Sequence, residues 1–224
     1  TPYQYAGNKP VSYIDLDGGE EIKVSDRLKN EIGIFDVFNQ ISQTNVFKKI
    51  QKQVQTVIDY AAFEQVNGNI YTYLRGKSSG GIVTINKNVY SPESNYDKTI
   101  VGKTMIHELI HERLTTIISK YIFQKDGKTY FKEAKFIKDY PGFADSIKKY
   151  GWNDDLQSNR GWQHNWMAKY GRNDMILVMK YLDKQYSINR ENKEYSADDW
   201  YEAISFAGLE NTDAWNDLSD EKKE

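Results

Sequence analysis

The sequence predicts an α+β fold, and three features of its apolar residues support this prediction. From Val24 onward, apolar side chains recur at spacings of three and four, the period of an amphipathic helix. Between residues 55 and 86, short β-branched and aromatic runs alternate with glycines and polar residues, as strands and turns do. From about residue 98 to Phe123 the helical spacing returns without a break. We therefore expect a small sheet, mostly from residues 55 to 86, packed on one long helix.

The composition is that of a folded domain and excludes several classes of protein. Of the 224 residues, 39% are hydrophobic and 28% charged, which suits one packed core and excludes a disordered chain. The formal net charge of −2 gives no excess of positive charge, so we expect no nucleic-acid partner. No apolar run approaches the roughly 18 residues of a membrane span, and we expect a soluble chain. The absence of cysteine excludes disulfides, zinc–thiolate sites and cysteine nucleophiles.

Two helices are expected at the start of the domain. One follows Val24, and a second follows a capping sequence at Thr44-Asn45. Their apolar stripe consists of Leu28, Ile32, Phe35, Phe38, Ile41, Val46, Ile50 and Val54.

Three strands are expected next, at residues 55–60, 70–74 and 81–86. The three glycines and two serines within residues 76–81 predict a hairpin-like loop, and residues 91–98 predict a polar loop. We expect the strand at residues 81–85 to border the cleft, where its backbone could pair with an extended substrate.

The C-terminal part is expected to be helical with polar connections. A short helix at residues 143–150 precedes a loop at 151–161, and residues 161–171 and 174–186 predict two helices or one helix broken at Gly171. Ser196 and Asp199 form a capping-box sequence before a helix at 198–207, which Gly208 is expected to end.

The long helix carries the sequence His107-Glu108-Leu109-Ile110-His111, which predicts a zinc site. Four residues advance about 400° around a helix, so both imidazoles project from one face. Such a pair can bind one Zn²⁺, while Glu108 lies close enough to take a proton from a water on the metal. The alternative is a buried helix with two hydrogen-bonded histidines.

The third metal ligand must come from elsewhere in the chain. Leu114 and Ile117 occupy the positions where the His-x-x-Gly-x-x-His extension of metzincins needs glycine and histidine. His164, the remaining histidine, is the predicted ligand, because two histidines on one turn cover only one side of a tetrahedral zinc. A carboxylate on a later segment is the alternative, the candidates being Glu133, Asp145, Asp154 and Asp155.

A group that stabilises a developing oxyanion is also expected near the metal. We predict Tyr170, which follows His164 on the same helical segment, with Arg160 and Arg172 as alternatives.

The first residues alternate aromatic side chains with turn formers such as Gly7-Asn8 and Asp17-Gly18, as in a strand-turn fragment. This stretch resembles the end of the Rhs/YD-repeat core, which runs much like YxYxxNNPxxxxDPxG and precedes a variable C-terminal domain. Leu16 replaces the proline of that motif, which argues against the self-cleavage seen in some Rhs proteins. We expect residues 1–20 to be the end of such a core and its linker, with the rest of the core and any export signal upstream. An ordinary β-turn segment is the alternative.

Residues 21–224 are then expected to form the variable domain. A strand at 81–86, the HExxH helix and a later His-x-x-Met-Ala segment beginning at His164 resemble the zincin-type metallopeptidase toxin domains that follow Rhs/YD cores. The resemblance implies a zincin-like fold and one Zn²⁺ per chain on His107, His111 and His164, with Glu108 as general base. It also implies a protein or peptide substrate, secretion or delivery into a target cell, and a cognate immunity protein.

Two other functions fit parts of the sequence. The same zinc could hydrolyse a non-peptide bond, because HExxH specifies activated water more firmly than substrate. Alternatively, zinc could be structural and the tryptophans could line a surface that binds sugars or peptides, these being Trp152, Trp162, Trp166, Trp200 and Trp215.

Overall fold

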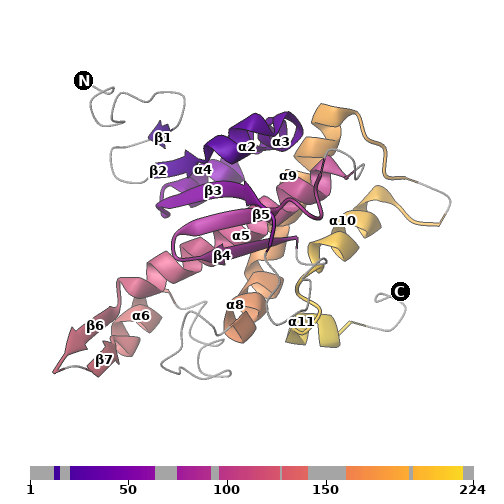
Figure 1. The fold of residues 1–224 in the computed structure, drawn as a ribbon. Coiled ribbons are helices and arrows are strands. Elements are labelled where there is room, and N and C mark those ends of the chain that lie inside the picture. Colours follow the sequence, from indigo (N-terminus) through magenta and orange to yellow (C-terminus); the bar gives the residue numbers. More distant parts are fainter. Residues whose placement is uncertain are drawn as a thin grey trace.

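The computed structural model describes residues 13–15, 21–63, 75–91, 96–126, 128–140, 160–191 and 194–218 (Figure 1). These residues form an α+β structure, as predicted, with a five-stranded mixed sheet, a separate two-stranded hairpin and helices packed around one main hydrophobic core. The predicted strand at 70–74, the predicted helix at 143–150 and most of the predicted connection at 151–161 lie outside the described residues.

The main sheet has the strand order β1-β2-β3-β5-β4. Its strands are β1 (Tyr13–Asp15), β2 (Glu21–Val24), β3 (Thr56–Ala61), β4 (Gly76–Ser79) and β5 (Ile82–Asn86). The pairs β2–β3 and β3–β5 are parallel, whereas β1 and β4 each pair antiparallel at an edge. Strand β1 comes from the predicted N-terminal segment 1–20 and pairs with β2, which lies in the part predicted to be a separate domain.

Two of the predicted strands are confirmed as β3 and β5, but the predicted loop at residues 76–81 is wrong. Residues 76–79 form β4, which pairs in register from Gly76 opposite Ile85 to Ser79 opposite Ile82. The Gly-Lys-Ser-Ser sequence has little intrinsic preference for a strand. Its extended conformation comes from the hydrogen bonds that β5 offers.

The predicted N-terminal helices are confirmed as α2 (Asp26–Asn30), α3 (Ile32–Ser42) and α4 (Asn45–Gln51). The Ser25 side chain caps α2 and the Thr44 side chain caps α4, each accepting a backbone N–H of the first turn. Their buried stripe contributes Leu28, Ile34, Val37, Phe38, Ile41, Val46, Phe47 and Ile50 to the core.

The long predicted helix is α5 (Lys98–Ser119), which packs on β4, β5, α3 and α9. Asp97 caps it by accepting the Thr99 N–H at 2.8 Å, and Arg190 donates to both oxygens of Asp97. The helix ends before Phe123, contrary to prediction, because the chain turns so that the Tyr121 ring packs on Phe136 at 5.1 Å. The following β6 (Ile122–Lys125), β7 (Lys128–Phe131) and α6 (Glu133–Asp139) were not predicted.

The next helices form one continuous run, so Gly171 does not break it. They are α8 (Arg160–Trp166), the π-helical η2 (Met167–Gly171) and α9 (Arg172–Tyr186). The π turn lies against α5, since a Cβ built at Gly171 would be 3.4 Å from Ile110 Cδ1. This contact brings α8 to the histidine-bearing part of α5.

The last elements are α10 (Ala197–Ser205) and α11 (Asp213–Asn216). The predicted capping box is confirmed, because the Ser196 side chain accepts the Asp199 N–H and the Asp199 carboxylate accepts the Ser196 N–H. Gly208, the predicted stop, has a φ of 87°, which favours glycine and turns the chain after α10.

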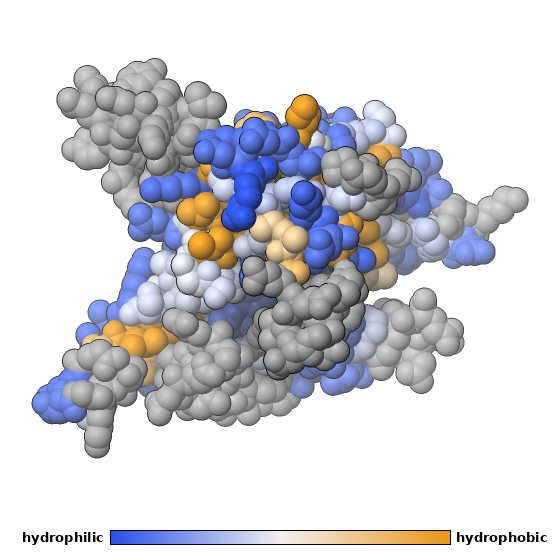
Figure 2. Space-filling model, viewed as in Figure 1, coloured by the Kyte–Doolittle hydropathy of each residue, from blue (hydrophilic) through white to orange (hydrophobic). Residues whose placement is uncertain are grey.

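The visible face of the molecule is largely hydrophilic, with small separate apolar areas over the sheet and near the β6–β7 hairpin (Figure 2). Exposed large apolar side chains are scattered over different elements, the most exposed being Ile32 and Leu177. Among the described helices, none combines the length and apolar character needed to cross a membrane.

Candidate metal centre

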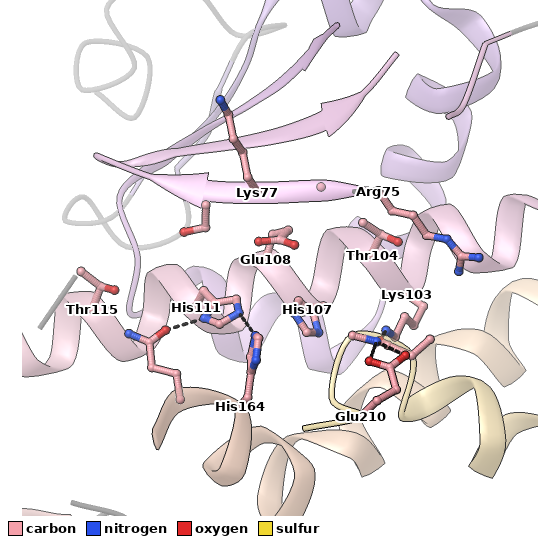
Figure 3. A pocket seen from close by; sticks show the side chains of 15 residues that line it. Arg75, Lys77, Lys103, Thr104, His107, Glu108, His111, Thr115, His164 and Glu210 are labelled. Atoms are coloured by element: carbon pink, nitrogen blue, oxygen red, sulfur yellow. Dashed lines mark hydrogen bonds between the residues drawn. The ribbon is translucent and has the colours of Figure 1, made fainter. Parts of the chain in front are cut away.

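The HExxH sequence lies in the middle of α5 and faces a cavity, as Figure 3 shows. His107 and Glu108 are each 7% exposed, and the rings of His107 and His111 lie 5.0 Å apart on successive turns. Apolar neighbours on the other faces of α5, such as Ile106 and Leu109, are fully buried. The packing of the helix therefore fixes the direction in which the two imidazoles point.

His164 comes to the same place from α8. Its ring centroid is 4.9 Å from that of His111 and 5.5 Å from that of His107. One nitrogen from each ring can be chosen so that all three lie within 4.8 Å of one another, and the group could hold a metal ion. The structure thus brings together the three histidines predicted as ligands.

The distance between His111 and His164 fits a small tetrahedral cation. Nε2 of His111 and Nε2 of His164 lie 3.1 Å apart. Two nitrogens bound tetrahedrally at 2.0–2.1 Å would be separated by about 3.3 Å. Three imidazoles without cysteine are also a donor set that suits zinc with one position left for water.

Gln163 orients one of these imidazoles and was not predicted from the sequence. It is 5% exposed, and its Oε1 lies within hydrogen-bond distance of His111 Nδ1. When Nδ1 donates to this oxygen, the unprotonated Nε2 faces His164. Such outer-shell hydrogen bonds fix the tautomer and ring orientation of histidines that bind metals.

Glu108 occupies the side of the cavity next to β4 (Figure 3). A Cβ built at Gly76 would lie 3.0 Å from Glu108 Cγ and 2.8 Å from Thr104 Cγ2. One turn further on, Ser78 Oγ donates to Glu112 Oε1. Strand β4 therefore runs along α5 at the rim of the cavity, and the predicted position of β5 beside the cleft is wrong.

The cavity has a volume of about 420 Å³. It is lined by residues from β4, α5, α8 and the segment after α10, namely Arg75, Gly76, Lys77, Ser78, Lys103, Thr104, His107, Glu108, His111, Thr115, Gln163, His164, Ala207, Gly208 and Glu210. This size is within the range of sites that bind small ligands or a few residues of a peptide.

Lys103 is a buried cation in this lining. Its side chain is one turn before His107 on α5, the residue is 4% exposed, and its ammonium group donates to the Ala207 carbonyl. Burial lowers the pKa of Lys103 to about 8, although the negative charge of Glu108 opposes this shift. The positive charge of Arg75 lowers the pKa further and Glu210 raises it, so both charges act on the same end of the cavity.

The predicted oxyanion group, Tyr170, and the alternative Arg172 do not line the cavity. Tyr170 is 41% exposed, packs its ring on Trp166, and is not part of the cavity lining. Arg172 donates to Glu202 and to Ser205 instead. The side chain of Arg160 lies outside the described part of the structure.

The alternative ligands and the tryptophan surface find no support in the described residues. Glu133 is exposed at the start of α6 and does not line the cavity. The other three candidate carboxylates, Asp145, Asp154 and Asp155, lie outside the described residues, as does Trp152. The remaining four tryptophans are buried in or packed against the hydrophobic clusters, these being Trp162, Trp166, Trp200 and Trp215.

No protein-family model matches this chain, and neither the curated proteins nor the solved structures include a significant match to it. What the chain does must therefore be inferred from its own residues.

Proposed function

We propose that this chain is a zinc-dependent peptidase with a zincin-like fold. The observation that carries the proposal is the convergence of His107, His111 and His164 beside the buried carboxylate of Glu108. Zinc held by the three imidazoles would lower the pKa of a water molecule and polarise a substrate carbonyl.

Glu108 is the proposed general base. It lies on α5 next to His107 and lines the same cavity, so its carboxylate can accept a proton from the attacking water. It can then deliver this proton to the nitrogen of the amine that leaves. Among the described residues, the other carboxylate in the cavity lining is Glu210, whose two oxygens both accept the Gly208 N–H at 2.9 Å.

Strand β4 favours a peptide over other substrates. Among the described residues, β4 is the last strand of the sheet and has β5 as its only strand partner. Its other edge runs along the cavity, where an extended peptide could add to the sheet by backbone hydrogen bonds. A substrate bound in this way would pass over Glu108.

We further propose that the peptidase is the toxin domain of a secreted Rhs-type effector and is neutralised by an immunity protein encoded with it. The support is the resemblance of residues 1–18 to the end of an Rhs/YD core together with the HExxH sequence. Expression of the chain in cells that lack the immunity protein should be toxic.

The central test is Glu108→Gln, which removes the proton acceptor and keeps the shape of the side chain. We expect unchanged zinc content and a loss of at least about 100-fold in the cleavage rate of a proteome-derived peptide library, followed by mass spectrometry. The control is Glu112→Gln, the same change one turn along α5 on a residue bonded to Ser78. Full activity of Glu108→Gln, or a zinc-loaded parent chain that cleaves no peptide, would overturn the proposal.

A further inference from the structure

The cavity extends beyond His107 to an end where two cations come together. One is Lys103, whose side chain extends from α5, and the other is Arg75, the residue that directly precedes β4 (Figure 3). The segment after α10 closes it with the Ala207 carbonyl, Gly208 and Glu210. This end lies next to the proposed catalytic groups but contains none of them.

Lys103 is the unusual member of the group. A buried ammonium ion is costly unless charges or several hydrogen bonds compensate it. In the described residues, Lys103 donates one hydrogen bond, to Ala207, and no carboxylate lies within ion-pairing distance of it. Two further donor positions of the ammonium group thus remain for a ligand.

The surrounding charges favour an anion. Arg75 is exposed and repels the positive charge of Lys103, so the two cations together gain from a negative group between them. Glu210 partly offsets this field, but both of its oxygens already accept the Gly208 N–H. Glu108, the other carboxylate acting on Lys103, is the proposed base and faces β4.

The direction of β4 tells which part of a peptide would reach this end. Strand β4 and α5 run in the same direction, since Gly76 lies against Glu108 and Ser78 bonds Glu112 one turn later. An antiparallel pairing, which is the more stable kind, would make the peptide run from the Ser78 end toward the Gly76 end. Residues after the scissile bond would therefore lie toward Arg75 and Lys103.

We propose that Lys103 and Arg75 form a subsite for a carboxylate on the residue that follows the scissile bond. The proposal rests on the peptidase function proposed above and assigns that site its substrate class. The carboxylate can belong to an Asp or Glu side chain or to the C-terminus of the substrate. In the first case the enzyme cuts before acidic residues, and in the second it removes single residues from the end of a chain.

The test measures binding and needs no known substrate. The probes are four peptide hydroxamates, whose hydroxamate group chelates zinc. They differ in the residue next to this group, which is an Asp amide, an Asn amide, an Ala with a free carboxylate or an Ala amide. Their affinities for the zinc-loaded chain are measured by calorimetry. We expect one of the two carboxylate probes to bind at least about tenfold more tightly than its neutral counterpart. A hydrogen bond to a charged group contributes enough binding free energy to produce a difference of this size. The Asp/Asn and Ala carboxylate/amide pairs distinguish the two sources of the carboxylate.

Lys103→Met and Arg75→Met should each reduce this preference severalfold or more. Arg75 is exposed, so its replacement leaves the fold intact even if Lys103→Met does not fold. The control is Lys87→Met, which removes the same charge from an exposed position outside the cavity lining. Equal affinity of the charged and neutral probes for the parent chain, or an unchanged preference in both variants, would overturn the subsite and leave the peptidase proposal intact. Failure of all four probes on a chain that holds no zinc would overturn both proposals.

Discussion

The backbone of Gly76 on the edge strand lies directly against the side chain of Glu108 on α5. A Cβ at Gly76 would be 3.0 Å from Glu108 Cγ and 3.3 Å from Glu108 Oε1. Real side chains essentially never show the accompanying distance of 2.8 Å to Thr104 Cγ2, so the strand or Thr104 must move when a methyl group is added. Glu108, at 3.0 Å, must give by a few tenths of an ångström unless the strand moves away from it. The absence of a side chain at residue 76 thus allows β4 to approach the proposed base.

Gly76→Ala is therefore expected to reduce peptide cleavage while leaving zinc content unchanged. A displacement of a catalytic group by about 1 Å can cost about 100-fold in rate. The heavy atoms nearest to the new methyl group belong to Thr104 and Glu108, so the three histidines should keep the metal. Cleavage rate and zinc content are measured together, with Ser79→Ala on the same strand, at an exposed position, as the control. A parent-like rate in Gly76→Ala would show that the position of β4 does not matter for Glu108.

The histidines of this site could be predicted from the sequence because their arrangement is local. HExxH on a helix fixes two side chains by helical geometry alone, and α5 does form over these residues. His164 followed from the chain having only three histidines, and the structure places it beside His111. A chain with 17 tyrosines offers no such restriction, and Tyr170 lies outside the cavity.

The rest of the site depends on contacts between distant segments. Strand β4 has a sequence typical of a loop and is extended only because β5 pairs with it. Lys103 could have been noticed in the sequence, since it is a lysine one turn before His107 in a helix where apolar residues such as Val101 and Met105 are buried. Gln163 offered only its position next to His164, and nothing in the sequence shows that it faces His111.

His164→Ala should remove zinc from the purified chain. Two nitrogens from one helix hold zinc much less tightly than three ligands from two elements, so the variant should purify largely without metal. The parent chain is expected to retain about one zinc per chain under the same conditions, measured by elemental analysis. Glu133→Gln, which changes the exposed alternative carboxylate on α6, is the control and should keep its zinc. Full zinc occupancy in His164→Ala would mean that another residue is the third ligand.

Gln163→Leu is expected to weaken zinc binding without removing a ligand. It deletes the acceptor for His111 Nδ1, and loss of such an outer-shell partner costs about 10-fold to 100-fold in metal affinity. Gln163→Glu retains an acceptor and should restore the affinity, which a purely structural role for the buried amide would not predict. Affinities are measured by competition with a chelator of known strength. Equal affinities of Gln163→Leu and the parent would show that the hydrogen bond does not support the metal.

Lys103 is expected to make the fold less stable at neutral pH. The pKa of its ammonium group falls from 10.5 to about 8 because of burial, so the folded state holds this proton less firmly than the unfolded state. Below pH 8 both states are protonated, and the full cost of burying the charge is present. Between pH 8 and 10.5 the folded state is already neutral and stability rises with pH, until above 10.5 both states are neutral and the cost is gone.

Lys103→Met should therefore raise the free energy of unfolding of the metal-free protein at pH 7. The pKa difference corresponds to about 3 kcal/mol, at 1.36 kcal/mol per unit. Loss of the hydrogen bond to Ala207 offsets about 1 kcal/mol, which leaves a gain of about 2 kcal/mol at pH 7 and no gain near pH 10.5. Urea unfolding in the presence of a chelator at the two pH values measures the free energy of unfolding. Lys87→Met is the control and should leave the free energy of unfolding unchanged at both pH values.

A variant that is less stable than the parent at pH 7 would contradict the prediction, because it would mean that the buried ammonium makes a net favourable contribution to the fold. A variant that gains stability and loses the preference for a carboxylate probe would identify Lys103 as a charge that the protein keeps for binding despite its cost to folding.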